Sequence, residues 1–489
     1  MDLEVTARPS ACWLEQIRDA ARCHWLFLII LFVGFSLRVL AQVAYRPALL
    51  FIDSYRYLAN LNFDPTRSEP VGYPVIVLRP MLSIFGNLVS VAALQHALGL
   101  GMGVALYWVL LRRGSRPWLA ALATVAVLLD AYQIQIEQNV LSEALFEALV
   151  LTTVVLLLWV PRPGLWALVA SGVVLGVAVT VRIVALPLVV PAVLFAAVVS
   201  PPGWSRLWRG GALALAFAIP LAMYVGYYYS AADAVGLTTA DGSVIAGRAE
   251  VIVDCRGLSL PAYERVLCPK EPLGHRMGVD QYAHDSDRPA LRVHPPPGQT
   301  VNQVLRDFAI RVFKHQPADF AGAILGDFAK GFAWSPTTSP GDRSVSRWQF
   351  QRSYPTFAGD DAVSTIRAYG GGGPSVVKPL ATFLRDYQLT VGFVPGAALA
   401  IAFFLGILGA TGVGRARRSG LRAACLLPTV FGLGLVLGAT VYEFSWRYQL
   451  PALIFAPLGG ALGLTALMRA SPEPPVAACG DATISSPAT

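Results

Sequence analysis

The chain has 489 residues, of which 55% are hydrophobic and only 14% are charged, and its mean hydropathy is +0.55. So little charge excludes an ordinary soluble protein of this length and predicts a polytopic membrane protein. The net charge of +8 does not indicate nucleic-acid binding, because the arginines cluster in short segments between apolar runs, where they report membrane topology.

Apolar runs long enough to cross a hydrocarbon core of about 30 Å predict about ten transmembrane helices. The N-terminal segment 1–23 is amphipathic, and no small-residue cleavage site follows it, so the first run is expected to remain as an uncleaved span. We place the spans at 24–44, 88–111, 118–136, 139–160, 165–181, 183–200, 211–229, 388–411, 421–441 and 448–469. We expect an all-α fold, divided into an N-terminal membrane module (24–229) and C-terminal membrane helices (388–469).

The connections between these spans alternate in charge. Arginine-rich links at 112–117, 161–164, 201–211 and 414–422 fall on one side, which the positive-inside bias predicts to be cytoplasmic, with both termini. The tail 470–489 is rich in Pro, Ala and Ser and is expected to be disordered there. The sequence thus predicts a multi-pass protein of the plasma membrane whose first loop (45–87) and long region 230–387 lie outside.

Region 230–387 is the only stretch long enough to form a folded subdomain outside the membrane, and we expect it to have mixed structure. It contains Cys255 and Cys268, whose spacing closes a small loop. Because disulfides persist in an oxidising outer compartment, we expect these two cysteines to be bonded, which stabilises the fold by roughly 3 kcal/mol in the chain-entropy model.

Acidic residues occur where the predicted spans reach the outer surface. Asp53 follows the first span, and on a helix it can share one face with Tyr57 and Asn60. A carboxylate at this depth can act as a general base, although Asp53 can also simply cap a surface helix. Glu137 and Glu143 flank the next outer link, and for Glu143 a functional role competes with a favourable charge at a helix start.

Arginines occupy the same predicted surface. Arg182 interrupts a long apolar run and Arg447 precedes the last span. Each can extend its guanidinium to lipid headgroups or bind a phosphate in bidentate geometry. For Arg38, inside the first span, we favour extension to the headgroups.

Other site chemistries find no support in the sequence. The six histidines are scattered, with no metal-ligand pair on one helix face, and neither a P-loop nor a dinucleotide fingerprint is present. We therefore predict no metal site and no cofactor. Carboxylates and arginines on one membrane face instead indicate a lipid-linked anionic donor, presented from the bilayer to an acceptor hydroxyl.

Four short motifs then follow one another in a recognisable order. They are PVGYP (70–74), LSEALF (141–146), GVAVTVR (176–182) and RYQLP (447–451). Together with the first-loop Asp, this order resembles the GT-C membrane glycosyltransferases, and most closely the bacterial relatives of protein O-mannosyltransferases and of lipid A aminoarabinose transferases. The segment 313–332 is similar to loops of actinobacterial members.

The resemblance implies an inverting hexosyl- or pentosyltransferase that uses a polyprenyl-phosphate sugar and a glycan, lipid or protein acceptor. The site roles are carried over by position or assigned to neighbouring residues. We assign catalysis to Asp53 and Glu143, donor-phosphate binding to Arg182, Arg447 and Tyr448, and substrate binding to Tyr57, Asp64 and Tyr73. Two alternatives remain: a transporter or flippase of lipid-linked sugars, and a non-catalytic protein of cell-envelope assembly.

Overall fold

The structure is a computed structural model that describes residues 10–469 except 240, 358–360 and 371. The tail 470–489 and residues 1–9 of the predicted N-terminal segment lie outside the described residues. The membrane part contains helices α1 (Ser10–Ala44), α4 (Leu88–Arg112), α5 (Pro117–Leu129), α6 (Ala131–Gln138), α7 (Glu143–Leu158), α8 (Leu165–Val181), α9 (Val189–Val199), α10 (Trp204–Ala232), α17 (Gly396–Thr411), α18 (Arg422–Tyr442) and α19 (Leu450–Met468).

The remaining elements lie in the loops. They are α2 (Ile52–Leu58), α3 (Arg79–Phe85), α11 (Asp241–Ile252), α12 (Val279–His284), α13 (Val301–His315), α14 (Pro317–Lys330), α15 (Ala362–Ala368), α16 (Lys378–Thr390) and two-residue strands β1 (Tyr45–Arg46) and β2 (Ser375–Val376). Short 3-10 turns that bear on the site are η2 (Ile183–Leu188), η5 (Val345–Trp348) and η7 (Trp446–Gln449). The fold is thus all-α, as the sequence predicts.

Among the described residues, five helices are long and apolar enough to cross a membrane: Arg22–Ala44, Leu88–Arg112, Trp204–Ala232, Arg422–Tyr442 and Trp446–Met468. A sixth span is possible if α5 and α6, bent by 47° at their junction, count as one. Four further apolar helices are shorter than a full membrane span. The number of about ten spans therefore stays a prediction.

Two predicted spans differ from the structure. The run 118–136 bends at Asp130, whose backbone leaves helical geometry. The Asp130 side chain accepts hydrogen bonds from the backbone N–H groups of Tyr132 and Gln133 and so starts a new helix. The run 388–411 begins only at Gly396, because Pro395 precedes it as N-cap and α16 ends at Thr390.

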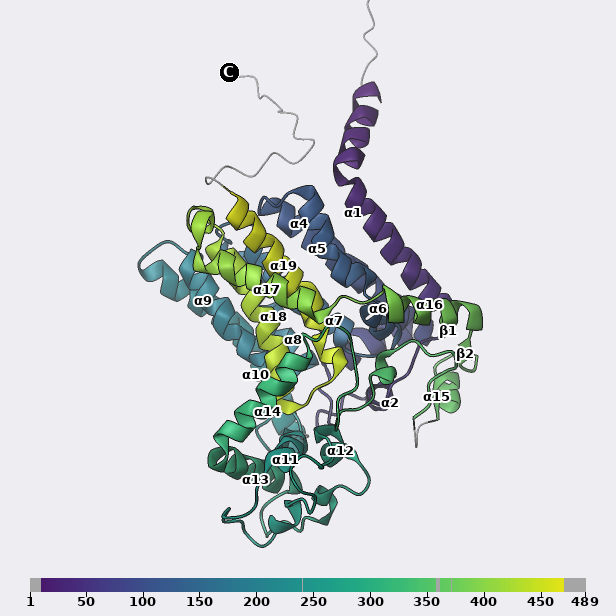
Figure 1. The fold of residues 1–489 in the computed structure, drawn as a ribbon, viewed down its shortest axis with the longest axis vertical. Coiled ribbons are helices and arrows are strands. Elements are labelled where there is room, and N and C mark those ends of the chain that lie inside the picture. Colours follow the sequence, from purple (N-terminus) through teal and green to yellow (C-terminus); the bar gives the residue numbers. More distant parts are fainter. Residues whose placement is uncertain (1–9, 240, 358–360, 371, 470–489) are drawn as a thin grey trace, which may run out of the picture.

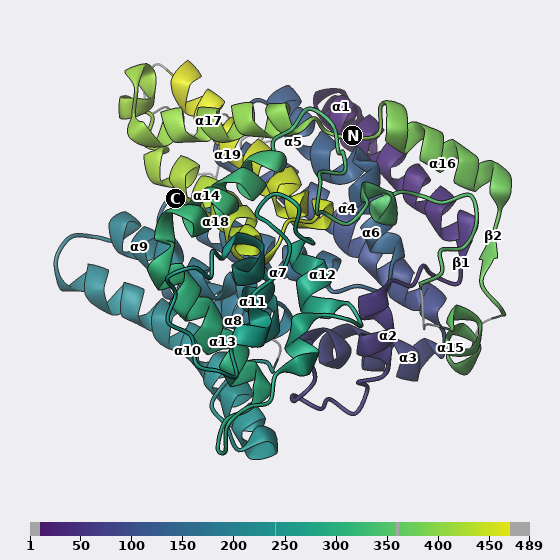
Figure 2. The same ribbon diagram turned by 60° about the horizontal axis from the view of Figure 1, so that its bottom comes forward.

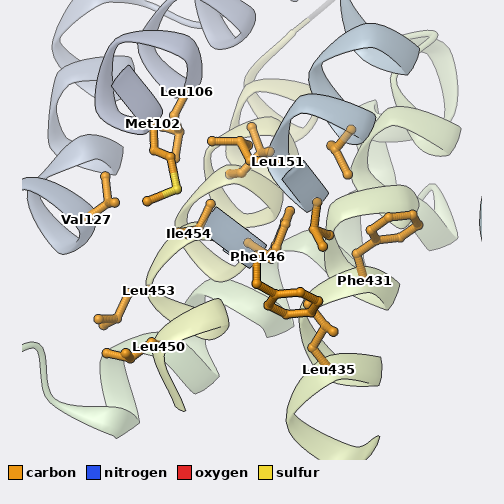
Figure 3. Packing of buried hydrophobic residues seen from close by; sticks show 14 of the residues in the cluster. Met102, Leu106, Val127, Phe146, Leu151, Phe431, Leu435, Leu450, Leu453 and Ile454 are labelled. Atoms are coloured by element: carbon orange, nitrogen blue, oxygen red, sulfur yellow. The ribbon is translucent and has the colours of Figure 1, made fainter. Parts of the chain in front are cut away.

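The core of the membrane part includes α7, of whose 16 residues 11 are buried. Figure 3 shows Phe146 and Leu151 of α7 beside Phe431 of α18, Ile454 of α19 and Met102 of α4. Such packing fixes the ends of α7, α8, α18 and α19 relative to one another, and these ends carry the site residues described below.

Helices α17 and α19 approach so closely that only glycine fits between them. A Cβ at Gly463 would lie 2.1 Å from the carbonyl oxygen of Leu405, and one at Gly409 would lie 2.7 Å from the Cα of Gly463. Small residues of this kind are typical of helix contacts in membranes, where close backbone approach supplies the packing energy.

Helices α11 to α14 of region 230–387 lie beyond one end of the bundle, at the bottom of Figure 1, and come forward in Figure 2, whereas α15 and α16 lie at the side, near β1. The described residues of this region form helices and loops with a single two-residue strand. That strand, β2, pairs antiparallel with β1 of the first loop, Tyr45 opposite Val376. The Cys255–Cys268 disulfide is present in this region, with an S–S distance of 2.07 Å.

The opposite end of the bundle carries exposed tryptophans. They lie in or beside the arginine-rich links and are Trp108, Trp118, Trp159, Trp166, Trp204 and Trp208. Tryptophan is enriched where protein meets the lipid headgroups, and arginine is enriched on the cytoplasmic side of membrane proteins. The two ends of the bundle therefore differ in character: one has the features of a membrane interface, and the other is covered by region 230–387.

Candidate active site

The first loop presents Asp53 from a short, fixed helix. The backbone N–H of Phe51 donates to Ser54 Oγ at 2.8 Å, and this pairing sets the start of α2. One turn later the Tyr57 hydroxyl donates to Ser142 Oγ at 2.9 Å in the core. Asp53 and Tyr57 therefore share a helix as expected, whereas Asn60 lies beyond the end of α2.

Asp53 meets the start of the last membrane span. Arg447 Nη1 lies 2.5 Å from Asp53 Oδ2 and 3.6 Å from Glu143 Oε1. Arg182, at the end of α8, donates from Nη1 to the same Glu143 oxygen. The structure thus brings together two carboxylates and two guanidinium groups from α2, α7, the end of α8 and η7. They are four of the five residues to which the sequence assigned catalysis and phosphate binding.

These charges are only partly satisfied. Arg447 Nε and Glu143 Oε2 are buried and have no hydrogen-bond partner among the described residues. An unpaired buried donor is costly, and it suits a ligand that brings its own acceptor. The Nε–H group of Arg447 therefore has no acceptor in the described part of the chain.

Aromatic rings surround the Arg447 guanidinium. Its Cζ lies 5.5 Å from the ring centroid of Phe51, 5.1 Å from that of Trp348 and 5.0 Å from that of Tyr448. Arg447 Nη2 also donates to the Tyr448 hydroxyl at 3.1 Å, and that hydroxyl donates to Glu443 Oε1 at 3.0 Å. The rings fix the cation without neutralising it.

The two acids outside the spans are held in different states. Burial alone would raise the pKa of Asp53, but Arg447, supported by Arg56, lowers that pKa below its usual value. Burial and the nearby Asp280 raise the pKa of Glu443 to about 7, against the opposing effect of Arg447. At neutral pH Asp53 is therefore ionised, whereas Glu443 holds its proton more readily than a free carboxyl group does.

All these groups line one cavity of about 1450 Å³. This exceeds the roughly 300–1,000 Å³ of an ordinary small-molecule pocket, so there is room for more than one substrate group. Its charged lining consists of Asp53, Arg56, Glu69, Glu143, Glu147, Arg182, Asp241, Asp280, His284, Asp285, Arg306, Arg343, Arg347, Glu443 and Arg447. The wall opposite the membrane helices comes from region 230–387.

Two predicted substrate-binding residues do not reach this cavity. The Asp64 carboxylate accepts hydrogen bonds from the backbone N–H and hydroxyl of Thr66, at 2.9 and 2.6 Å, and so closes a local turn. Tyr73 is fully buried and donates to Gln95 Oε1 at 2.6 Å. Neither is among the described lining residues, and we withdraw the substrate role for both.

Arg38 was also placed wrongly. It does not extend to headgroups: its side chain is 2% exposed, and Nε lies 2.7 Å from Glu137 Oε2. The sequence shows both residues but gives no sign that a residue of the first span meets one that lies 99 positions later. Trp348 and Arg347, from region 230–387, were missed for the same reason, since no local pattern marks them.

No group of three or more His, Cys, Asp or Glu side chains that could hold a metal ion occurs among residues 10–469 as described. The site consists of charged and aromatic side chains. What it can do directly is bind an anion on two arginines and accept a proton on a carboxylate beside them.

Residues 72–233 match the family model of dolichyl-phosphate-mannose-protein mannosyltransferases. This match confirms the predicted resemblance to GT-C membrane glycosyltransferases. The matched segment includes Glu143 and Arg182 and ends in α10, so Asp53 and Arg447 lie outside it. The actinobacterial type stays a prediction.

Solved structures with a similar arrangement are distant. The apo oligosaccharyltransferase of Archaeoglobus fulgidus is 12% identical, with a TM-score of 0.43. The alignment covers 90% of this chain and 50% of the archaeal chain. ArnT from Cupriavidus metallidurans bound to undecaprenyl phosphate is 14% identical with a TM-score of 0.32, covering 92% and 78%. The chain thus spans half the length of the archaeal protein. Comparison with curated protein sequences gives no significant match.

Proposed function

We propose that this protein is an integral-membrane glycosyltransferase that moves a sugar from a polyprenyl-phosphate carrier to an acceptor hydroxyl, with inversion at the anomeric carbon. The observation that carries the proposal is the meeting of Asp53 with Arg447, whose Nε has no partner in the described part of the chain. The family match over 72–233 supports the same reaction class.

The proposed reaction is a single displacement. The acceptor oxygen forms a bond to the anomeric carbon while the bond from that carbon to the phosphate oxygen breaks, and its electron pair leaves with the phosphate. Asp53 accepts the hydroxyl proton. Arg447 and Arg182 stabilise the second negative charge that develops on the departing polyprenyl phosphate, with Tyr448 beside them.

Donor binding and base activation are coupled in this proposal. Before the donor binds, Arg447 holds Asp53 ionised and lowers its basicity. A donor phosphate that binds Arg447 competes with Asp53 for the same guanidinium and adds a negative charge nearby, and both effects raise the pKa of Asp53. The carboxylate therefore becomes a better base when the sugar to be transferred is present.

We place the reaction on the outer face of the cell membrane. Supporting this, the cavity lies at the end covered by region 230–387, whereas the arginine-rich links and exposed tryptophans lie at the other end. An outer site also suits a donor that is already attached to a lipid.

Radiolabelled polyprenyl-phosphate sugars supplied to membranes containing the protein test the proposal. We expect label to pass into a product that is no longer bonded to the polyprenyl carrier, with wild type but not with Asp53→Asn. Label that crosses the bilayer while still bonded to the carrier, at equal rates in both, would instead identify a flippase.

A further inference from the structure

Six arginines line the cavity, and five of them are paired with carboxylates. Arg56 pairs with Glu69, Arg182 with Glu143, Arg306 with Asp241, Arg343 with Asp280 and Asp285, and Arg447 with Asp53. Arg347 is the exception. Among the described residues, no carboxylate lies within ion-pair distance of its guanidinium.

The backbone that carries Arg347 is held firmly. Ser344 Oγ accepts from the backbone N–H of Ser346 at the start of η5, at 3.2 Å. At its end Gln388 Nε2 donates to the Trp348 carbonyl at 3.0 Å, and the Trp348 ring contacts Arg447. The hydrogen bonds of Ser346 and Trp348 therefore fix the backbone on both sides of Arg347. Arg347 also precedes Trp348, whose ring packs against Arg447 of the proposed donor-phosphate site.

The charges around Arg347 compensate it only in part. The nearby Arg343 has both of its acidic partners, Asp280 and Asp285, already bound. Burial and Arg343 lower the pKa of Arg347, and the more distant Asp280, Asp285 and Glu443 raise it without cancelling that effect. A partly buried cation at a cavity wall, with no carboxylate in ion-pair contact among the described residues, fits an anionic ligand.

We propose that Arg347 binds an anionic group, a phosphate or a carboxylate, of the acceptor substrate. This rests on the proposed function, which assigns the donor phosphate to Arg447 and Arg182 at the ends of the membrane helices. Arg347 belongs instead to the wall made by region 230–387, the side from which an acceptor outside the bilayer arrives. The acceptor class is thus an anionic, hydroxyl-bearing compound.

The test uses the full chain in lipid nanodiscs that contain undecaprenyl phosphate to occupy the donor site. Inorganic phosphate is titrated at constant ionic strength, and its apparent affinity is read from the rise in thermal unfolding temperature. Arg347→Gln should weaken phosphate binding by about tenfold or more, because a charge-assisted hydrogen bond is lost. Arg352→Gln, in the same loop but outside the cavity lining and 64% exposed, is the matched control and should bind as wild type does.

Three results decide the matter. Unchanged phosphate binding in Arg347→Gln overturns the proposal. An equal loss of undecaprenyl phosphate and inorganic phosphate in that variant assigns Arg347 to the donor site and overturns the acceptor assignment. If Arg347→Gln fails to fold, Arg347→Lys takes its place, and retained phosphate binding in Arg347→Lys with loss in Arg347→Ala supports the subsite.

The proposed donor site is tested separately in the same nanodiscs. Arg447→Gln should weaken binding of undecaprenyl phosphate itself. If it does not, the donor assignment fails. The comparison of phosphate binding between Arg347→Gln and Arg352→Gln would still show whether a separate anion site exists.

Discussion

Two clusters of buried charge in this protein have similar members but opposite designs. In the first, Arg38 pairs with Glu137, and His96 Nδ1 lies 3.0 Å from the same carboxylate. In the second, Arg447 pairs with Asp53 and lies near Glu143. The first is enclosed between helices, and the second lines a cavity.

The difference lies in how many donors each arginine has left. The guanidinium of Arg38 makes hydrogen bonds to both Glu137 oxygens and to the carbonyls of Gly34, Val127 and Leu128, which uses all of its N–H groups. Arg447 donates to Asp53 and to the Tyr448 hydroxyl, is surrounded by aromatic rings, and leaves Nε unpaired among the described residues. A saturated cluster stabilises a fold, whereas an unsaturated one is ready for a ligand.

The largest expected effect is on turnover through the open cluster. Asp53→Asn keeps the size of the side chain but cannot take the proton, so sugar transfer should fall about 10²- to 10⁴-fold. Donor affinity should stay the same or improve, because the charged Asp53 carboxylate no longer competes with the donor phosphate for Arg447. Asp64→Asn, on a local turn, is the control for a transfer assay with labelled donor and should retain near-normal turnover. Equal losses in both variants would place the base elsewhere, with Glu143 the next candidate.

Breaking the closed cluster should affect folding instead. Arg38→Gln leaves Glu137 buried without its cation, and we expect a loss of about 3–5 kcal/mol in stability. Arg447→Gln should cost less, since Asp53 keeps Arg56 at 3.5 Å. Thermal unfolding of both variants in the same detergent checks this order; a larger loss at Arg447 would show that the two clusters do not differ in the way described.

A smaller effect separates charge from geometry within the open cluster. Arg447→Lys retains the positive charge but loses the planar fork that binds two phosphate oxygens. Binding of undecaprenyl phosphate should weaken by roughly tenfold, since one charge-assisted hydrogen bond is lost. Equilibrium binding in nanodiscs measures it, and a lysine variant that binds as tightly as wild type would mean that charge alone suffices.

The last comparison concerns a buried acid that has no cation paired with it in the described part of the chain. Both carboxylate oxygens of Glu250 in α11 lack partners among the described residues, and burial raises the pKa of this group to about 9. Because the folded pKa lies above the unfolded one, the protonated form supports the fold fully below about pH 4.5, and this support is lost as pH rises towards 9.

Glu250→Gln should therefore unfold at a higher temperature than wild type at pH 8 and at a similar temperature at pH 4.5. Scanning calorimetry at the two pH values measures the difference. A gain in unfolding temperature of equal size at both pH values would show that packing, not ionisation, causes the stabilisation.

The sequence allowed prediction of the all-α fold and of four charged residues that the structure brings to one cavity, because both rest on local signals. Apolar length marks the spans, and Asp53, Glu143, Arg182 and Arg447 stand out as charges at the ends of apolar runs. The bend at Asp130 was missed because a capping carboxylate inside an apolar run looks like any other polar residue.

The pairing of those charges was not predictable from local pattern. Whether an arginine meets a carboxylate or lipid depends on which helices pack together, and single-sequence periodicity does not say so. Region 230–387 is the extreme case: Arg347 and Trp348 sit in a loop without periodicity, and they reach the cavity only because distant segments such as Gln388 hold them there. Asp64 and Tyr73 were misplaced because sequence proximity to Asp53 does not determine side-chain direction.

The distance along the chain between Asp53 and Arg447, 394 residues, also sets the order of assembly. At synthesis rates of about 5–20 residues per second, roughly 20 to 80 s separate the emergence of the two. Glu143 and Arg182 are only 39 residues apart and can pair early. Asp53 must wait for the last membrane helix, so a truncated or stalled chain leaves Asp53 without Arg447, and the proposed reaction centre is among the last parts of the molecule to form.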